Sequence, residues 1–125
     1  MDSFFEDADL IYSYTRAQAI ADGVLIDISF IAKDLGFKYP VAVTDSIWNK
    51  YILYNGEQSQ DTMGRLWDLL WMFKIAASRC TGDLLFFTVS YIMNSGQTEN
   101  VKLKALCGAG DTREPVITIM LPEED

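Results

Sequence analysis

The sequence predicts an α+β fold in which a three-stranded antiparallel sheet packs against one long helix. Over residues 62–79, apolar side chains recur every three or four positions, the spacing that places them on one face of a helix. Further along, apolar positions alternate with a period of two, which is typical of strands. The strand-like runs are residues 84–93, 100–107 and 116–121. Turn residues separate them, so we expect a meander whose apolar face the helix covers.

The long helix is apolar around most of its circumference. Such a helix is normally buried on more than one side. We therefore expect Trp67 and Trp71 to lie in the core rather than on a surface that meets a partner or ligand. Charged side chains such as Arg65 interrupt this apolar surface at only a few positions.

The amino-terminal half predicts short helices and an edge strand. Thr15 and Gln18 have the spacing of a capping box, and Gly23 is suited to end the helix that follows. Residues 24–28 and 41–43 are apolar and β-branched, although runs this short fit a helix as well as a strand. A turn or two of helix over residues 30–35 and a helix from Thr44 or Asp45 to Tyr54 complete this half. The strand at residues 116–121 would leave an exposed edge.

Length and composition indicate one globular domain spanning residues 1–125, with acidic ends at 1–10 and 122–125. Half of the residues are hydrophobic, which is enough for a core. No apolar run approaches the ~20 residues of a membrane span, and two distant cysteines, Cys80 and Cys107, give no disulfide framework. We expect a cytoplasmic protein that does not bind membranes.

The acidity of the chain is concentrated at its two ends. The formal net charge is −8, yet seven of the eighteen acidic residues lie within residues 1–10 and 122–125. The remainder carries eleven acids and ten bases, so its net charge is −1. This pattern argues against direct binding of nucleic acid, which requires a basic surface. Acidic ends can serve simply as solubilising, partly frayed termini, or they can meet a basic groove on another protein.

The residue types that usually carry catalysis are sparse. The chain contains no histidine, which removes the usual Ser-His-Asp and Cys-His arrangements and the commonest transition-metal ligand. The glycine-rich stretch 107–111 follows a strand, but another strand follows in place of the helix that a phosphate cradle needs. We expect a connecting loop there, no cofactor or metal, and no enzymatic activity.

Three parts of the sequence carry a resemblance to a known family. They are residues 11–27, residues 66–72 (Leu-Trp-Asp-Leu-Leu-Trp-Met), and the ending formed by residues 103–111 and 114–122. Together they resemble a family of small acidic bacterial proteins of unknown function that are encoded on plasmids, prophages and integrated elements. The resemblance covers nearly the whole chain and implies a setting, a bacterial cytoplasm and mobile DNA. It implies no activity and no functional residue.

These observations favour a non-enzymatic interaction protein that binds and inhibits a host nucleic-acid-handling defence complex, of the anti-CRISPR or anti-restriction type. Its acidic ends and exposed aromatic side chains would enter a basic groove of the partner. The candidate partner-binding residues are Glu6, Asp7, Asp9, Tyr12, Tyr14, Trp48, Glu123, Glu124 and Asp125. One alternative is an accessory protein for plasmid or phage maintenance or transfer. Another is a small-ligand module or enzyme near residues 108–114.

Overall fold

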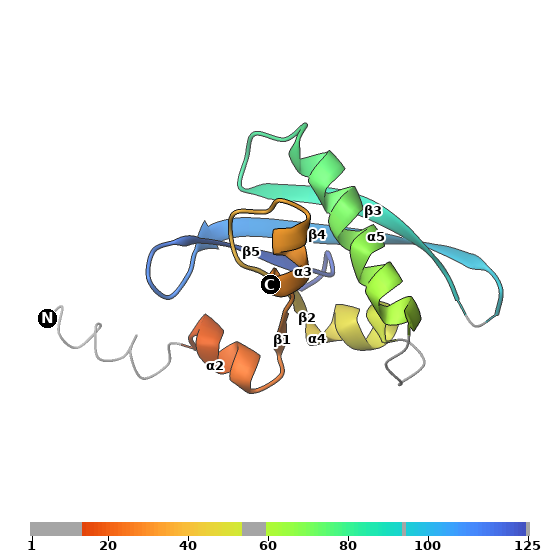
Figure 1. The fold of residues 1–125 in the computed structure, drawn as a ribbon, viewed down its shortest axis with the longest axis horizontal. Helices are drawn as coiled ribbons and strands as arrows, with labels where there is room; N and C mark the ends of the chain where they lie inside the picture. The colour runs from red at the N-terminus through yellow and green to blue at the C-terminus, as the bar shows by residue number, and fades with distance from the viewer. Residues whose placement is uncertain (1–13, 54–59, 94, 125) are drawn as a thin grey trace, which may run out of the picture.

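The fold combines one mixed sheet with several helices (Figure 1). A computed structural model describes residues 14–53, 60–93 and 95–124. Its helices are α2 (Arg16–Ala21), α3 (Ser29–Asp34), α4 (Asp45–Ile47), the π-helix η1 (Trp48–Ile52) and α5 (Gln60–Ala77). Its strands are β1 (Leu25–Asp27), β2 (Val41–Thr44), β3 (Leu84–Ile92), β4 (Thr98–Ala109) and β5 (Pro115–Met120). The predicted α+β class is confirmed.

The sheet has five strands in the order β1-β2-β5-β4-β3. The predicted meander is present, because β3 pairs antiparallel with β4 and β4 pairs antiparallel with β5. The amino-terminal half adds two strands: β1 lies antiparallel to β2, and β2 lies parallel to β5. The expectation that residues 116–121 form an exposed edge is therefore wrong. The strands at the two edges are β1 and β3.

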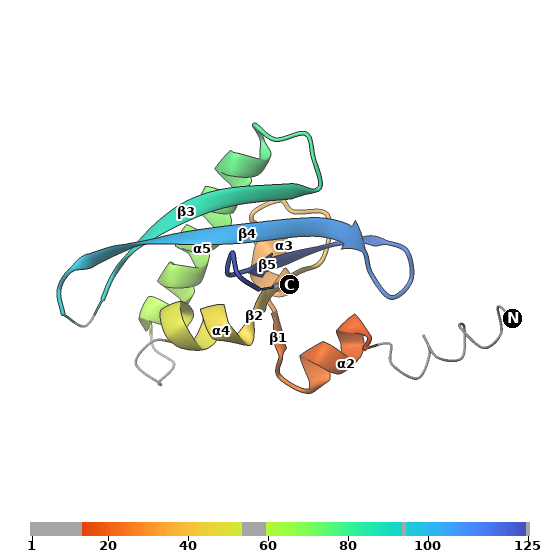
Figure 2. The same cartoon turned by 180° about the vertical axis from the view of Figure 1, so that it is seen from behind.

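The core lies between the sheet and one face of α5, with α3 on the same side (Figures 1 and 2). Leu66, Leu69 and Leu70 are fully buried at this face of α5. Phe73 stacks on Phe37 at 5.4 Å between ring centroids and meets Phe87 of β3 at 5.5 Å. The predicted alternation of β3 is confirmed, with one side of the strand buried in this core and the other exposed.

The outer face of α5 differs from expectation. Trp67 is 41 % exposed and Trp71 is 51 % exposed, and Met63, Met72 and Ile75 are also exposed. The helix is therefore buried on one side only, and the prediction that both tryptophans lie in the core is wrong. The apolar periodicity locates the buried stripe correctly, but it does not reveal whether a second layer covers the opposite side.

A buried polar cluster joins α5 to η1 and β3. Arg65 donates from Nη1 to the carbonyl of Tyr51 at 2.8 Å and from Nη2 to the carbonyl of Ile92. Its guanidinium lies 4.8 Å from the ring centroid of Tyr91, whose hydroxyl donates to the Arg65 carbonyl at 2.7 Å. Tyr51 stacks on Tyr91 and donates to Glu99 at 2.8 Å. The cluster fixes the position of the amino-terminal half of α5.

Unfolding of the protein is expected to become easier as the pH rises from about 10 to about 12. Burial, together with the hydrogen bond to Glu99, raises the pKa of Tyr51 to about 12, whereas an unfolded tyrosine titrates near 10. The folded state thus retains the proton longer, and the stabilisation present below pH 10 is lost through this window. Urea midpoints across the range measure the decline. It should be shallower in Tyr51→Phe, and an equal slope in both proteins would contradict this assignment.

Candidate functional site

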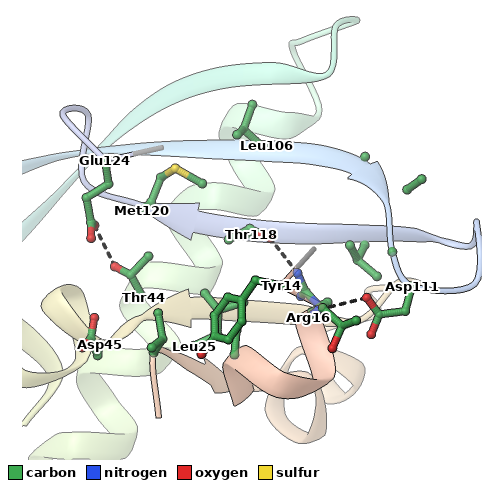
Figure 3. A pocket seen from close by; sticks show the side chains of 17 residues that line it. Tyr14, Arg16, Leu25, Thr44, Asp45, Leu106, Asp111, Thr118, Met120 and Glu124 are labelled. Carbon is green, nitrogen blue, oxygen red and sulfur yellow. Dashed lines mark hydrogen bonds between the residues drawn. The ribbon is translucent and has the colours of Figure 1, made fainter. Parts of the chain in front are cut away.

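A hollow of the size of a ligand site lies between α2 and the face of the sheet opposite α5 (Figure 3). We call it the groove. Its volume is about 500 Å³, within the range of about 300–1,000 Å³ that is usual for ligand sites. Its walls are the start of α2, the β1 end of the sheet, the β4–β5 loop and Glu124. Apolar side chains that line it include Ala19, Val24, Leu25, Leu106, Val116 and Met120.

α2 is positioned at the groove by its own cap and by the β4–β5 loop. The predicted capping box is confirmed, because Thr15 Oγ1 accepts from the Gln18 amide at 3.0 Å and Gln18 Oε1 accepts from the Thr15 amide at 2.9 Å. The amides of Arg16 and Ala17 donate to the Asp111 carboxylate at 2.9 and 3.0 Å. These two bonds lower the pKa of Asp111. The carboxylate therefore satisfies first-turn amides that the helix itself leaves unpaired.

Arg16 is held across the floor of the groove. It donates from Nη1 to Thr118 Oγ1 at 2.6 Å and from Nη2 to the carbonyl of Ile117 at 2.9 Å. Burial lowers the pKa of its guanidinium, and the carboxylates of Asp27 and Asp111 oppose that shift. The side chain thus fastens α2 to β5 and has its donors directed at the protein itself.

The glycine-rich loop connects β4 to β5, as expected, and brings Asp111 to α2. A side chain at Gly110 would place its Cβ 2.8 Å from Val116 Cγ1, which is too close for any other residue without a shift. The Gly110 amide donates to the Glu114 carbonyl at 2.8 Å, which closes the turn. The loop therefore presents a carboxylate to a helix amino terminus, the reverse of a phosphate cradle.

The carboxyl-terminal residues close the opposite side of the groove. Glu124 Oε1 accepts from Thr44 Oγ1 at 2.8 Å and from the Leu121 amide at 2.8 Å. Lys104 donates to the carbonyl of Pro122 at 3.2 Å and to that of Glu124. Glu124 is therefore half-buried and already bonded within the chain, while Glu123 is exposed.

The structure places only part of the predicted partner-binding set. Tyr14 is 54 % exposed, lines the groove and donates to Asp22 at 2.5 Å, a bond that raises the pKa of the phenol. Trp48 is half-buried and packs against the core, away from the residues that line the groove. Glu6, Asp7, Asp9, Tyr12 and Asp125 lie outside the described residues.

Acids predominate among the charged residues that line the groove. Tyr14 and Glu124, the first and last described residues of the chain, both belong to its lining. Among the charged side chains of the lining, the carboxylates of Asp45, Asp111 and Glu124 accompany a single base, Arg16. The rim is therefore acidic and the floor largely apolar.

Sequence reasoning missed the apolar residues on this side of the sheet. Leu84, Phe86 and Ile92 of β3 are 47 %, 49 % and 66 % exposed, and Leu106 of β4 is 37 % exposed beside the groove. Figure 2 shows that no helix covers β3 and β4 from this side. A signal was available, because apolar residues occupy both faces of residues 84–92 and not one face alone.

Within residues 14–53, 60–93 and 95–124, no three side chains of the metal-binding types gather closely enough to hold an ion. Across the same described part, no helix has the length and apolarity needed to cross a membrane. Cys80 and Cys107 are both free thiols.

Comparison with known proteins places the chain in a family. The model of a family of unknown function, DUF6573, matches residues 1–125. The chain belongs to this family. The resemblance to a family of unknown function is thereby confirmed over the whole chain. No curated protein matches the DUF6573 chain, and no solved structure matches it.

Proposed function

We propose that this protein is a non-enzymatic interaction protein whose groove binds a basic surface of another protein. One observation carries the proposal: the groove has an apolar floor and an acidic lining, in which Asp45, Asp111 and Glu124 accompany a single base, Arg16. Apolar floors supply affinity through burial, and complementary charges at the rim supply orientation and speed of association. A protein surface that carries lysine or arginine around an apolar side chain is the complement of this site.

The polar groups of the groove favour a protein over a small substrate. Arg16 is bonded to β5, Thr44 to Glu124, and Tyr14 to Asp22. A substrate site needs polar groups directed at the ligand to orient it. Here several of the polar side chains that line the groove instead bond to one another or to neighbouring residues.

We further propose that the partner is a nucleic-acid-handling complex of a bacterial host. Such complexes carry basic grooves that hold a phosphate backbone, and an acidic protein can occupy them in its place. The resemblance to proteins encoded on mobile elements supports an inhibitory, anti-CRISPR or anti-restriction role in the cytoplasm. An accessory role in maintenance or transfer of such an element would use the same surface on a different partner.

Affinity capture from bacterial lysate tests this function. The tagged chain is washed at low and then at high salt, and bound proteins are identified by mass spectrometry. We expect capture of a nuclease or surveillance complex that high salt releases, because exposed charge pairs are screened over about 8–10 Å. The double reversal Glu6→Lys with Asp7→Lys should release it at low salt. If neither high salt nor the charge reversal changes the capture, the electrostatic mechanism is contradicted. Capture of replication or transfer proteins would favour the accessory role.

A small-ligand function is the second candidate, because the groove has the volume of a ligand site and includes the β4–β5 loop. A ligand that binds only the folded state raises thermal stability, by about 2.7 kcal/mol at a hundredfold excess over Kd. Metabolite and nucleotide panels should leave the melting temperature unchanged if the protein-binding function is correct. A saturable increase that Arg16→Gln abolishes would instead establish the ligand site.

A further inference from the structure

The free edge of β3 lies outside the groove. β3 pairs with β4 through nine consecutive residues without a bulge, and β3 lies at the end of the strand order. Proteins usually protect such edges with charged residues, proline, bulges or a covering segment. Residues 84–92 contain no charge, no proline and no glycine. This edge therefore lacks the usual protection against pairing with another strand.

The hydrogen bonds to β4 identify which residues face the free edge. The Cys107 amide donates to the Asp83 carbonyl at 2.8 Å, and the Met93 amide donates to the Gln97 carbonyl at 2.9 Å. Odd-numbered residues thus direct their backbone groups at β4. Because successive residues of a strand direct these groups to opposite sides, the even-numbered residues of β3 direct theirs to the edge.

The two ends of the edge are already occupied. The carbonyl of Ile92 accepts from Arg65, and the carbonyl of Leu84 accepts from the Cys80 thiol at 3.8 Å. Between them, Phe86, Thr88 and Ser90 present alternating N–H and C=O groups that have no partner among the described residues. The open stretch is the length of a short strand segment.

One apolar side chain of α5, Met72, lies on the side of the helix that faces this stretch. Arg65 reaches Ile92 at the free edge, whereas Lys74 donates to the carbonyl of Leu35 in the opposite direction. These two contacts fix the rotation of the helix. Helix geometry then places Met72, seven residues after Arg65, on the side of Arg65, toward the edge. Met72 is 38 % exposed.

We propose that the edge of β3 binds an extended, uncharged segment of a partner protein, which adds to the sheet as a sixth strand. The alternating backbone donors and acceptors of Phe86, Thr88 and Ser90 are the complement of another extended backbone. Side chains on one side of the added strand would pack against Met72. Those on its other side would extend the row that contains Phe86, over which Lys102 lies at 5.0 Å.

A second copy of this chain does not fit the same edge. α5 crosses β3, and its carboxyl-terminal end passes beyond the strand (Figures 1 and 2). Edge-to-edge pairing of two copies through β3 would bring the ends of both α5 helices to the joint between the two sheets. The occupant is therefore a segment without a helix at that position.

Selection from a displayed library of random linear peptides against the full chain tests the proposal. We expect selected peptides with apolar residues at alternate positions. They should slow amide exchange of Phe86, Thr88 and Ser90 at least about tenfold and leave the amides around the groove unchanged. Thr88→Pro removes one edge donor, which an edge strand tolerates, and should weaken peptide binding at least about tenfold. Thr88→Val retains the N–H group and should bind normally.

The exposed residue Met72 provides a second variant in case the proline disturbs β3. Met72→Asp should weaken the same peptides, while far-ultraviolet circular dichroism confirms the fold. A library without binders would overturn the proposal, as would peptides that Thr88→Pro does not affect. A dimer that this substitution converts to a monomer would show that the occupant is a second copy. None of these results tests binding at the groove, which is measured with other variants of the chain.

Discussion

Replacing Arg65 with methionine is expected to lower the free energy of unfolding by about 3 kcal/mol, since two hydrogen bonds from a charged group are lost and each is worth about 1.5–3 kcal/mol. Arg65 is only 8 % exposed and joins α5 to the carbonyls of Tyr51 and Ile92. Its removal leaves carbonyl groups without a donor beside the Tyr51–Tyr91 stack. Methionine retains much of the volume, so the loss reports on polar contacts rather than on a cavity.

Urea denaturation monitored by tryptophan fluorescence measures this loss. Arg65→Lys retains the charge but loses the forked geometry that reaches two carbonyls at once, so an intermediate loss is expected. Arg79→Met, in the exposed segment after α5, is the matched control and should change stability by less than about 0.5 kcal/mol. A loss in Arg65→Met no larger than in this control would show that the cluster does not hold α5.

Truncation of Phe73 should destabilise the fold by about 3–5 kcal/mol, the usual range for a buried aromatic residue replaced by alanine. Phe73 is 4 % exposed and contacts both Phe37 and Phe87. Trp71, only two positions earlier in the same helix, is 51 % exposed. Trp71→Ala should therefore cost about 1 kcal/mol or less.

The comparison of these two substitutions tests which side of α5 faces the core. Equilibrium unfolding of both variants under the same conditions gives the two losses directly. Equal losses in the free energy of unfolding would mean that the outer face of α5 is buried in solution. That result would contradict the exposed position of Trp71 in the structure.

Sequence patterns predicted the structural features that depend only on residues close together in the chain. The capping box at Thr15 and Gln18 needs only a spacing of three residues, and the two-residue alternation of β3 records one buried face. These features were therefore predictable from the sequence. The exposure of the outer face of α5 was not predictable. An apolar helix face indicates that another layer of protein covers it, but the sequence does not reveal whether that layer belongs to the same chain.

Contacts between distant residues explain the remaining differences. The parallel pairing of β2 with β5 joins segments some 75 residues apart, and it moves β5 from an edge to the interior of the sheet. Asp111 caps a helix that begins 95 residues earlier. Neither pairing leaves a periodic signal in the sequence. The groove depends on both, so its location could not be predicted. Of its acidic lining residues, only Glu124 belongs to the acidic ends noted in the sequence.

Binding of the captured partner to two lysine variants tests the role of the groove most directly. Leu106→Lys places a positive charge in the groove, and Ile92→Lys places one on the same face of the sheet but outside the groove. The account predicts that Leu106→Lys weakens binding at least about tenfold, whereas Ile92→Lys binds as the original protein does. Equal affinities for the two variants would contradict it and would move the interaction surface away from the groove.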